Sequence, residues 1–440
     1  MNNDTPKPLY WFYLDNYVHL ERLEDRVLLY NSLTGEIREY ADNPAVLQLV
    51  EKLQAPENLL VVPLGEKELE DPQISAFVRE MRSLFMGDLI ETSRSSGKPV
   101  QMMPMLKLHR DIDKMKTESF RSVGVDVMKY LDNMALYVNG NCTLDCNICA
   151  SAHKQFLWCN REKSGTQLPI DQIRQLFEQL VGSDLCHVHI LGGNILTYPG
   201  LRELISILAE HRLKRTLYIH YSNLADGRDS LQDLGLIPDS NCQIKIPVTF
   251  PVDETKLEKA SHILEDCSMP GTFAFALQSE AEFAEAECLI SAFSIDPVSF
   301  HPFFNGQNLE FFEQAVFVDR QNLSNARPSM KDIHSRQVMN PFLFGNLTVL
   351  SNGDIHAGVN DPSLGNLSKD SIYDIVYREV FEGKTWRRTR KEVVPCRDCV
   401  FAALCPPLSH YEYALGKNNL CRIVGSVKAD EKGEEIHYKS

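Results

Sequence analysis

The 440-residue sequence predicts an α/β fold in which strands and helices alternate along the central part of the chain. Three observations support this prediction: the alternation itself, a hairpin followed by helices near the N-terminus, and cysteines grouped in two metal-ligand spacings. Strand–helix alternation is typical of a parallel sheet with right-handed crossovers. A chain of this length is expected to form two or three domains, each with its own core.

Residues 1–92 are expected to form a small N-terminal domain. Its strand between Arg26 and Asn31 is followed by Ser-Leu-Thr-Gly, a hairpin turn signal. Asn43-Pro44 and Asp71-Pro72 each predict a helix start with proline at the first helical position. The expected elements are strands at residues 10–17, 26–31 and 36–40, and helices at residues 44–53 and 72–85. A structural cap or a dimerisation module would show the same pattern. Residues 93–132 are expected to be a linker.

The central segment, residues 133–325, carries the strand–helix alternation. The expected strands are near 134–139, 185–191, 216–221, 243–249, 271–277 and 296–301, and the expected helices near 170–181, 200–211, 254–267 and 280–292. His187 and His189 lie on the second strand, and we expect at most one of them to face the inside of the sheet.

Cys142, Cys146 and Cys149 form a C-x3-C-x2-C triplet directly after an apolar run, residues 135–138. Three thiolates from one short loop can hold three corners of a [4Fe–4S] cluster and leave the fourth iron open to a small molecule. A zinc-binding knuckle or three buried cysteines are the alternative interpretations of the triplet.

The spacing of the triplet, and its place after a first strand, resembles the radical S-adenosylmethionine (SAM) superfamily. The resemblance implies a partial (β/α)6 barrel similar to a TIM barrel, with functional groups at the C-terminal ends of the strands. It also implies that the open iron chelates the amino and carboxylate groups of SAM. An electron from the cluster then cleaves SAM to a 5′-deoxyadenosyl radical.

The same resemblance implies which residues contact SAM. Residues 192–195, Gly-Gly-Asn-Ile, stand where the family usually has Gly-Gly-Glu-Pro. Asn194 therefore replaces the glutamate and supplies no negative charge. Ser222 and Asn223, at the end of the third strand, resemble a Thr-Asn pair that reaches the ribose hydroxyls. The expected SAM-binding residues are Ile148, Gly192, Gly193, Asn194, Ser222 and Asn223. Cys159 is the best candidate for a thiol that donates a hydrogen atom, although most lone cysteines are packing residues.

A second cysteine group lies near the C-terminus. Cys396, Cys399 and Cys405 form C-x2-C-x5-C, and Cys421 follows. The stretch from about residue 340 to 423 resembles the SPASM extension of peptide-modifying radical SAM enzymes, because it also carries an Asn-Gly-Asp turn and a Gly-Asn-Leu signature. A SPASM-like domain is expected over residues 326–425, with a charged tail over residues 426–440. Four cysteines satisfy tetrahedral zinc equally well.

The departures from the SPASM pattern are specific. A complete SPASM domain has seven motif cysteines and two auxiliary clusters. Two of the expected cysteines are replaced by Gly358 and Ser409, and no cysteine lies between Cys288 and Cys396. The resemblance therefore implies one auxiliary [4Fe–4S] cluster, held by the C-terminal quartet, and two clusters in all.

Composition limits the partners. The formal charge of −15 argues against a nucleic acid and mildly favours a basic or neutral substrate. No apolar stretch is as long as a membrane span, and the N-terminus lacks a secretory signal pattern. Cysteines in metal-ligand spacings indicate a reducing cytoplasm.

The resemblance implies a radical SAM enzyme that cross-links or epimerises a ribosomally made precursor peptide, supplied with electrons by flavodoxin or ferredoxin. By pattern and position, the N-terminal domain resembles a winged-helix peptide-recognition domain, whose third strand offers an edge to a leader peptide. The chain also resembles a Bacteroidales group of pseudo-radical-SAM partners, which commonly lack the first triplet. A non-catalytic peptide-binding partner of a separate maturase is therefore the alternative. A sulfatase-maturing enzyme, which oxidises a cysteine or serine of a protein, is a third hypothesis. That family carries both auxiliary clusters, whereas this sequence has ligands for one, which disfavours it.

Overall fold

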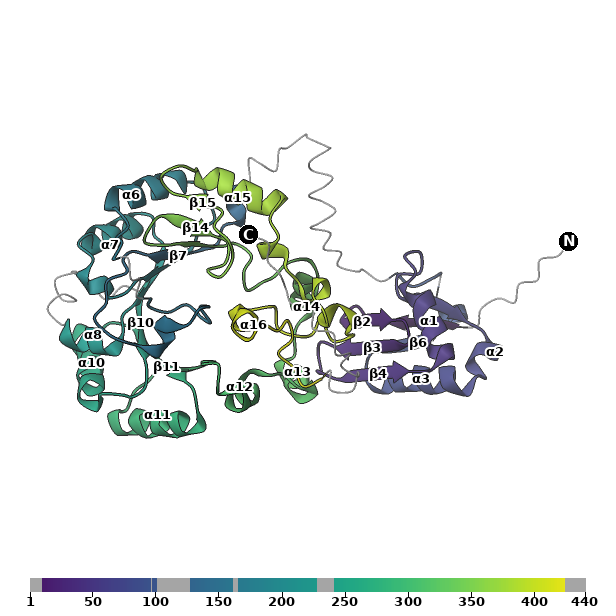
Figure 1. Cartoon of the computed structure of the whole chain (residues 1–440). Coiled ribbons are helices and arrows are strands. Elements are labelled where there is room, and N and C mark those ends of the chain that lie inside the picture. The colour runs from purple at the N-terminus through teal and green to yellow at the C-terminus, as the bar shows by residue number, and fades with distance from the viewer. Residues whose placement is uncertain (1–9, 96, 101–126, 161–164, 228–240, 424–440) are drawn as a thin grey trace.

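The computed structural model describes residues 10–95, 97–100, 127–160, 165–227 and 241–423. The tail expected at residues 426–440 and much of the expected linker, residues 101–126, lie outside the described residues. A large body built around one sheet is joined to a smaller N-terminal part (Figure 1). No helix in the described ranges is both long and apolar enough to cross a membrane.

A nine-stranded, mostly parallel sheet forms the centre of the large body (Figure 1). Six of its strands are parallel and lie in chain order, so each crossover runs in the same direction and the sheet curls into an open barrel. They are β7 (Asn133–Tyr137), β8 (His187–Leu191), β9 (Lys214–Tyr218), β10 (Cys242–Val248), β11 (Gly271–Leu277) and β12 (Val298–Pro302). All six predicted strands are confirmed, within a few residues at their ends.

The outer side of this sheet is covered by helices (Figure 1). The four predicted helices are confirmed as α6 (Ile170–Gln179), α7 (Leu201–Glu210), α10 (Glu254–Cys267) and α11 (Glu280–Phe293). The apolar faces of these helices, such as Leu204 and Leu208 of α7, are buried in the main core. One further helix, α8 (Tyr221–Asp226), was not predicted. It begins directly after β9 because the ring of His220 accepts a hydrogen bond from the Ser222 N–H group and caps its first turn.

The inner side of the barrel carries polar side chains on β8 and β9. The expectation that only one of His187 and His189 faces inward is wrong, because residues two apart on a strand share a face. Their ring centroids are 4.0 Å apart. His187 bonds to Thr216 Oγ1 at 2.8 Å, and His189 bonds to the Tyr218 hydroxyl at 3.3 Å.

The C-terminal part of the chain continues the same sheet. Strand β13 (Asn346–Val349) pairs in parallel with β7, and β14 (Asp354–His356) and β15 (Gly365–Asn366) follow in antiparallel order. Helix α15 (Ile372–Phe381) buries its apolar face in the main core. The domain boundary expected at residue 326 therefore falls between strands of one continuous sheet. The other helices here are α12 (Leu309–Val316), α13 (Arg320–Ala326), α14 (Met330–Val338) and α16 (His410–Leu415).

The N-terminal part contains two three-stranded antiparallel sheets, in the orders β5-β1-β6 and β2-β3-β4. Its elements are β1 (Tyr10–Leu14), β2 (Val18–Leu23), β3 (Arg26–Asn31), β4 (Ile37–Ala41), α1 (Pro44–Gln54), β5 (Val61–Leu64), α2 (Glu66–Leu69), α3 (Pro72–Ser83) and β6 (Gly87–Glu91). The predicted hairpin is β3–β4, and the predicted helices are α1 and α3, capped by Asn43 and Asp71. Strands β2, β5 and β6 were not predicted.

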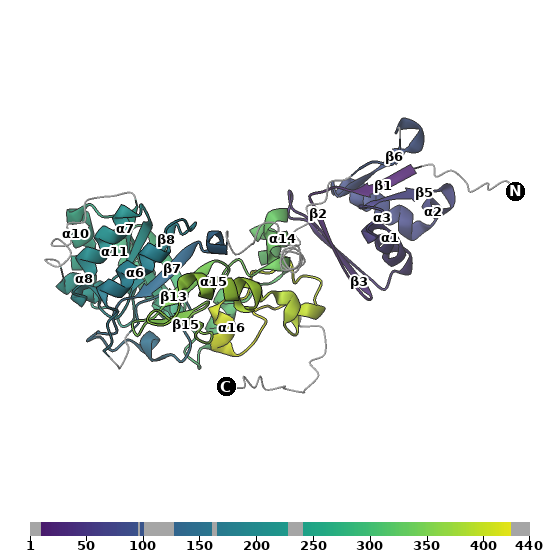
Figure 2. The same cartoon turned by 90° about the horizontal axis from the view of Figure 1, so that it is seen from above.

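The N-terminal part packs against the C-terminal segment (Figure 2). Leu28 and Tyr30 of β3 share one apolar core with Phe401 and Cys405. The Tyr30 hydroxyl donates a hydrogen bond to the carbonyl oxygen of Pro328 at 3.0 Å. The packing therefore joins β3 directly to the segment that carries the second cysteine group.

Replacing Phe275 by alanine should destabilise the barrel by about 3–5 kcal/mol. The Phe275 ring, on β11, is fully buried, and its removal leaves a cavity in the core. Urea-induced unfolding followed by circular dichroism would measure the loss. Phe283→Ala is the matched control: this ring is 37% exposed on α11 and should cost less than about 1.5 kcal/mol. Equal losses in the two variants would contradict this assignment of the core.

Candidate functional site

The loop after β7 places the first cysteine triplet at the C-terminal end of the barrel strands. Cys146 caps a short 3-10 turn, Asn147–Ala150, that contains Cys149, and the Cys149 N–H group donates to the Cys146 carbonyl at 3.0 Å. The Cys149 sulfur lies 3.9 Å from the carbonyl oxygen of Cys159. Cys142 and Cys146 also lie close enough to Cys159 to affect its thiol, so the structure gathers four cysteines in one place.

Hydrogen-bond donors from neighbouring elements reach two of the three triplet sulfurs. Asn223 Nδ2 on α8 lies 3.9 Å from the sulfur of Cys142. Thr249 Oγ1, just after β10, and His220 Nε2, just after β9, each lie 3.8 Å from the sulfur of Cys146. Donors of this kind stabilise thiolates bound to iron. The residues present therefore fit a cluster held by the triplet.

The sequence did not point to His220 or Thr249. His220 is buried, its Nδ1 accepts from the Ser222 N–H group at 3.3 Å, and its Nε2 lies 3.0 Å from Thr249 Oγ1. Burial, with a smaller effect from Lys256, lowers the pKa of His220 to about 4. The ring is therefore neutral near pH 7 and carries its proton on Nε2, the nitrogen that faces Cys146 and Thr249. The sequence offered one signal for these two residues: each is a polar residue just after a barrel strand, His220 after the third and Thr249 after the fourth.

The Gly192-Gly193 pair lies against the cysteine loop. A Cβ atom at Gly192 would lie 2.6 Å from Asn139 Oδ1, and one at Gly193 would overlap the Asn141 carbonyl oxygen. The Gly193 N–H group donates to the Asn139 carbonyl at 2.9 Å. Both glycines are therefore required for this close backbone contact. Asn194 Oδ1 accepts from the Leu196 N–H group at 3.1 Å and caps the next turn.

The other predicted SAM-site residues lie close by. Ser222 and Asn223 are buried in the first turn of α8 rather than in a loop. Ile148 and Cys159 belong to one small apolar cluster, which includes Trp158. Burial is the main cause that raises the pKa of Cys159 well above its usual value, and the nearby cysteine thiolates add to it. Its sulfur therefore keeps its proton near pH 7.

The four C-terminal cysteines lie around one cavity, which they share with Arg390. They are Cys396, Cys399, Cys405 and Cys421. Burial raises the pKa of Cys405 to about 12, so an empty site disfavours its thiolate. Across the described ranges, no three His, Cys, Asp or Glu side chains form a group that fits a single metal ion.

Arg390 connects this cavity to the surrounding fold. Its guanidinium is buried, pairs with the buried carboxylate of Glu412 at 2.9 Å, and donates to the sulfur of Cys396 at 3.7 Å. It also donates to the carbonyl oxygen of Asn418 at 3.1 Å. A positive charge beside a cysteine sulfur favours the thiolate that binds metal.

Two positions where the resemblance expects further cysteines have other structural roles. A Cβ atom at Gly358 would lie too close to Asp361 Oδ2, so a side chain there would require the Asp361 carboxylate to move. Ser409 is the N-cap of α16, where its hydroxyl lies 2.7 Å from Glu412 Oε2. In this structure both positions therefore serve local packing or helix capping.

No family model matches the chain, and no curated protein does. Streptococcus suis SuiB bound to S-adenosylmethionine gives a TM-score of 0.46 at 14% identity, over 93% of this chain and 97% of that one. SuiB bound to precursor peptide SuiA gives a TM-score of 0.40 at 12% identity, over 93% of this chain and 98% of that one. Hexahistidine-tagged anSMEcpe with bound AdoMet gives a TM-score of 0.41 at 11% identity, over 65% of this chain and 91% of that one. All three TM-scores lie below 0.5.

Replacing Arg390 by glutamine should destabilise the protein by about 3–5 kcal/mol, because the buried Glu412 carboxylate loses its only described ion-pair partner. Urea-induced unfolding would measure the change. The matched control is Arg397→Gln, whose exposed pair with Asp398 should contribute less than about 1 kcal/mol. A loss at Arg390 no larger than the loss at Arg397 would contradict the buried-pair assignment.

Proposed function

We propose that this chain is a radical SAM enzyme, a peptide-modifying oxidoreductase, that abstracts a hydrogen atom from a ribosomally made precursor peptide. One observation carries the proposal. The Cys142, Cys146 and Cys149 loop lies at the C-terminal end of a parallel barrel, with side-chain donors from neighbouring elements reaching the sulfurs of Cys142 and Cys146. The C-terminal edge of such a barrel is where reactive groups collect in this architecture.

The loop cysteines would hold three irons of a [4Fe–4S] cluster and leave the fourth for SAM. When bound, the cluster and SAM supply one-electron chemistry that ends in hydrogen abstraction from an unactivated C–H bond. Asn223, Thr249 and His220 would orient the sulfurs and supply hydrogen bonds to them. This division of roles leaves the reactive chemistry to the cofactors and the positioning to the chain.

The proposed SAM contacts are Ile148, Gly192, Gly193, Asn194, Ser222 and Asn223. The close approach of Gly192 and Gly193 to the loop supports them, because it brings the end of β8 next to the cysteines. The side chain of Asn194 already caps its own turn, so the proposed contact there is with backbone groups.

Cys396, Cys399, Cys405 and Cys421 would hold one auxiliary [4Fe–4S] cluster, which relays an electron or maintains the C-terminal segment. Their arrangement around one cavity, with Arg390 beside them, supports this assignment. Zinc at the same quartet could not relay an electron and would leave only the structural role. Metal analysis of the purified protein distinguishes zinc from an iron–sulfur cluster.

Residues 1–92 would recognise the leader of the precursor peptide as a winged-helix-like domain, followed by a linker to residue 132. The third predicted strand, now β4, lies at the edge of its sheet and pairs only with β3 among the described strands. An extended peptide can add to such an edge through backbone hydrogen bonds. The barrel would span residues 133–325 and the SPASM-like domain residues 326–425. Flavodoxin or ferredoxin would supply electrons in the cytoplasm.

A second candidate function is a non-catalytic peptide-binding partner of a separate maturase. The observation that favours it is Asn194, which replaces an acidic residue and directs its side-chain oxygen to the Leu196 N–H group. In that case iron would bind, but SAM would not be cleaved even with peptide present.

Replacing Cys142, Cys146 and Cys149 together by alanine should abolish 5′-deoxyadenosine release from SAM. It should also reduce bound iron from roughly eight to roughly four per chain, because each cluster holds four irons. Anaerobic reconstitution, iron analysis and chromatography of the nucleoside would measure both quantities. The matched control replaces the four C-terminal cysteines and should lose iron to the same extent while retaining some nucleoside release. A wild-type protein that binds iron without cleaving SAM would favour the non-catalytic partner.

Replacing Cys159 by alanine tests it as a hydrogen-atom donor. If it is the donor, the variant should still release 5′-deoxyadenosine, while the amount of epimerised peptide falls at least about tenfold, because the substrate radical is no longer quenched. Cys288→Ala, at an exposed cysteine on α11, is the control and should change neither quantity. Unchanged epimerisation in Cys159→Ala would assign Cys159 to packing.

A further inference from the structure

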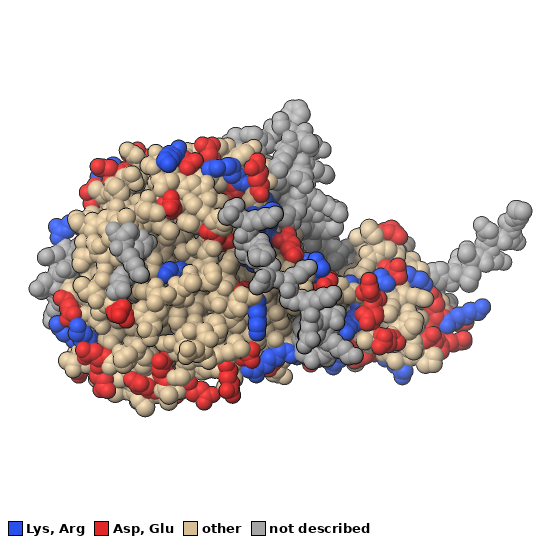
Figure 3. Space-filling model, viewed as in Figure 1, with Lys and Arg blue, Asp and Glu red and all other residues tan. Residues whose placement is uncertain are grey.

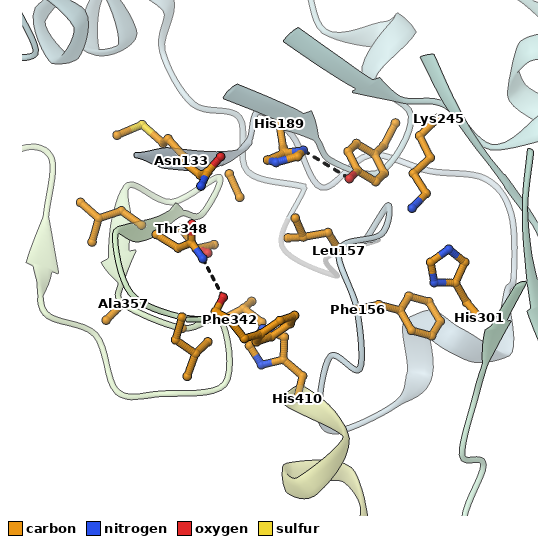
Figure 4. A pocket seen from close by; sticks show the side chains of 18 residues that line it. Asn133, Phe156, Leu157, His189, Lys245, His301, Phe342, Thr348, Ala357 and His410 are labelled. Atoms are coloured by element: carbon orange, nitrogen blue, oxygen red, sulfur yellow. Dashed lines mark hydrogen bonds between the residues drawn. The ribbon is translucent and has the colours of Figure 1, made fainter. Parts of the chain in front are cut away.

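A cavity of about 350 Å³ lies inside the barrel, between its strands and the C-terminal segment (Figure 4). One wall is formed by inward side chains of the barrel strands, and the opposite wall by Phe342, Thr348 and His410. Its volume lies in the range of small-ligand pockets rather than of single-ion sites. None of the proposed cluster cysteines or SAM contacts lines it.

The barrel wall of this cavity carries one cation. Lys245 of β10 points into the cavity toward the ring of His301 (Figure 4). No aspartate or glutamate lines the cavity, and no described carboxylate lies within ion-pair distance of Lys245. Lys245 is partly buried, and this burial lowers its pKa. A partly buried charge without a partner is costly, and an incoming anion would offset that cost.

The three histidines of the cavity add hydrogen-bonding groups and no charge. Burial is the main cause that lowers the pKa of His189 to about 3, and of His301 and His410 to about 4. The positive charge of Lys245 also acts on His189 and His301. The cavity therefore carries a single positive charge near neutral pH, which matches a monoanion better than a phosphate dianion.

The rest of the lining is suited to an apolar stem. Phe156 and Leu157, which follow the cysteine loop, line the cavity, with Phe156 beside His301 and Leu157 nearer the middle (Figure 4). The ring of Phe156 packs 5.2 Å from that of His301. A short methylene chain can contact these side chains while a carboxylate at its end reaches Lys245.

We propose that this cavity binds the carboxylate side chain of an aspartate or glutamate in the precursor peptide, with the Lys245 ammonium as its counter-ion. The inference rests on the proposed function for the identity of the peptide, and it assigns a substrate class to the barrel interior. It also differs from the preference for a basic or neutral substrate that the overall charge suggests. Local charge decides here, because the Lys245 ammonium lies inside the cavity, whereas no aspartate or glutamate lines it and the acidic side chains seen in Figure 3 lie on the outer surface.

Binding of two capped amino acids to the full-length, reconstituted protein tests the proposal. Isothermal titration would compare N-acetyl-glutamate methylamide with its uncharged isostere, N-acetyl-glutamine methylamide. We expect the glutamate probe to bind about tenfold more tightly, the difference that one charge-assisted contact supplies. The preference should disappear in Lys245→Met and in Lys245→Gln. It should remain in the control Lys259→Met, which removes the same charge from the exposed face of α10.

Three results would overturn the proposal: no binding of either probe, equal binding of both, or a preference that survives in both Lys245 variants. Tighter binding of free butanoate than of the capped glutamate would assign the cavity to a small monocarboxylic acid instead of a peptide side chain. Thermal unfolding checks that the variants fold, and Lys245→Met should melt at or above the wild-type temperature because it removes a buried charge. The titration involves no SAM cleavage, so its failure is distinct from a failure of the proposed function.

Discussion

Strand β7 is hydrogen-bonded along both of its edges, to β8 on one side and to β13 on the other. This double pairing fixes the position of the loop that follows β7, and that loop carries Cys142, Cys146 and Cys149. The barrel thereby supplies the elements whose side chains reach the sulfurs, while β13 ties the C-terminal segment to the same strand. The cavity around Lys245 exists because these two parts of the chain meet across β7.

The barrel strands and helices could be predicted from the sequence, because buried parallel strands and amphipathic helices leave regular apolar patterns. Helix α8 could not, because its start depends on a hydrogen bond from the Ser222 backbone to the His220 ring. The pairing of β13 with β7 joins residues more than 200 positions apart, and short strands carry no local signal of such a partner. The error at His187 and His189 was of another kind, since the sequence spacing alone places both on one face.

For the candidate site, spacing identified the cysteines but not the groups that support them. Thr249 and Arg390 have no motif of their own, and their roles arise from tertiary contacts. Spacing also marked Gly358 and Ser409 as departures, and the structure supplies the physical reason for each. The Asp361 carboxylate occupies the space where a side chain at Gly358 would begin, and Ser409 caps a helix. A cysteine at Gly358 would therefore have to displace the Asp361 side chain.

The core shared by Leu28, Tyr30 and Cys405 has a consequence for how the two ends of the chain communicate. Cys405 is at once a wall of the cysteine cavity and a packing partner of β3. If a metal at the quartet changed the affinity of the N-terminal sheet for a peptide by some factor, the peptide would change the affinity for the metal by the same factor. Under the proposed function, the shared core offers a route for such a coupling. Incorporation of the metal would then affect recruitment of the peptide as well as stability, without any contact between metal and peptide.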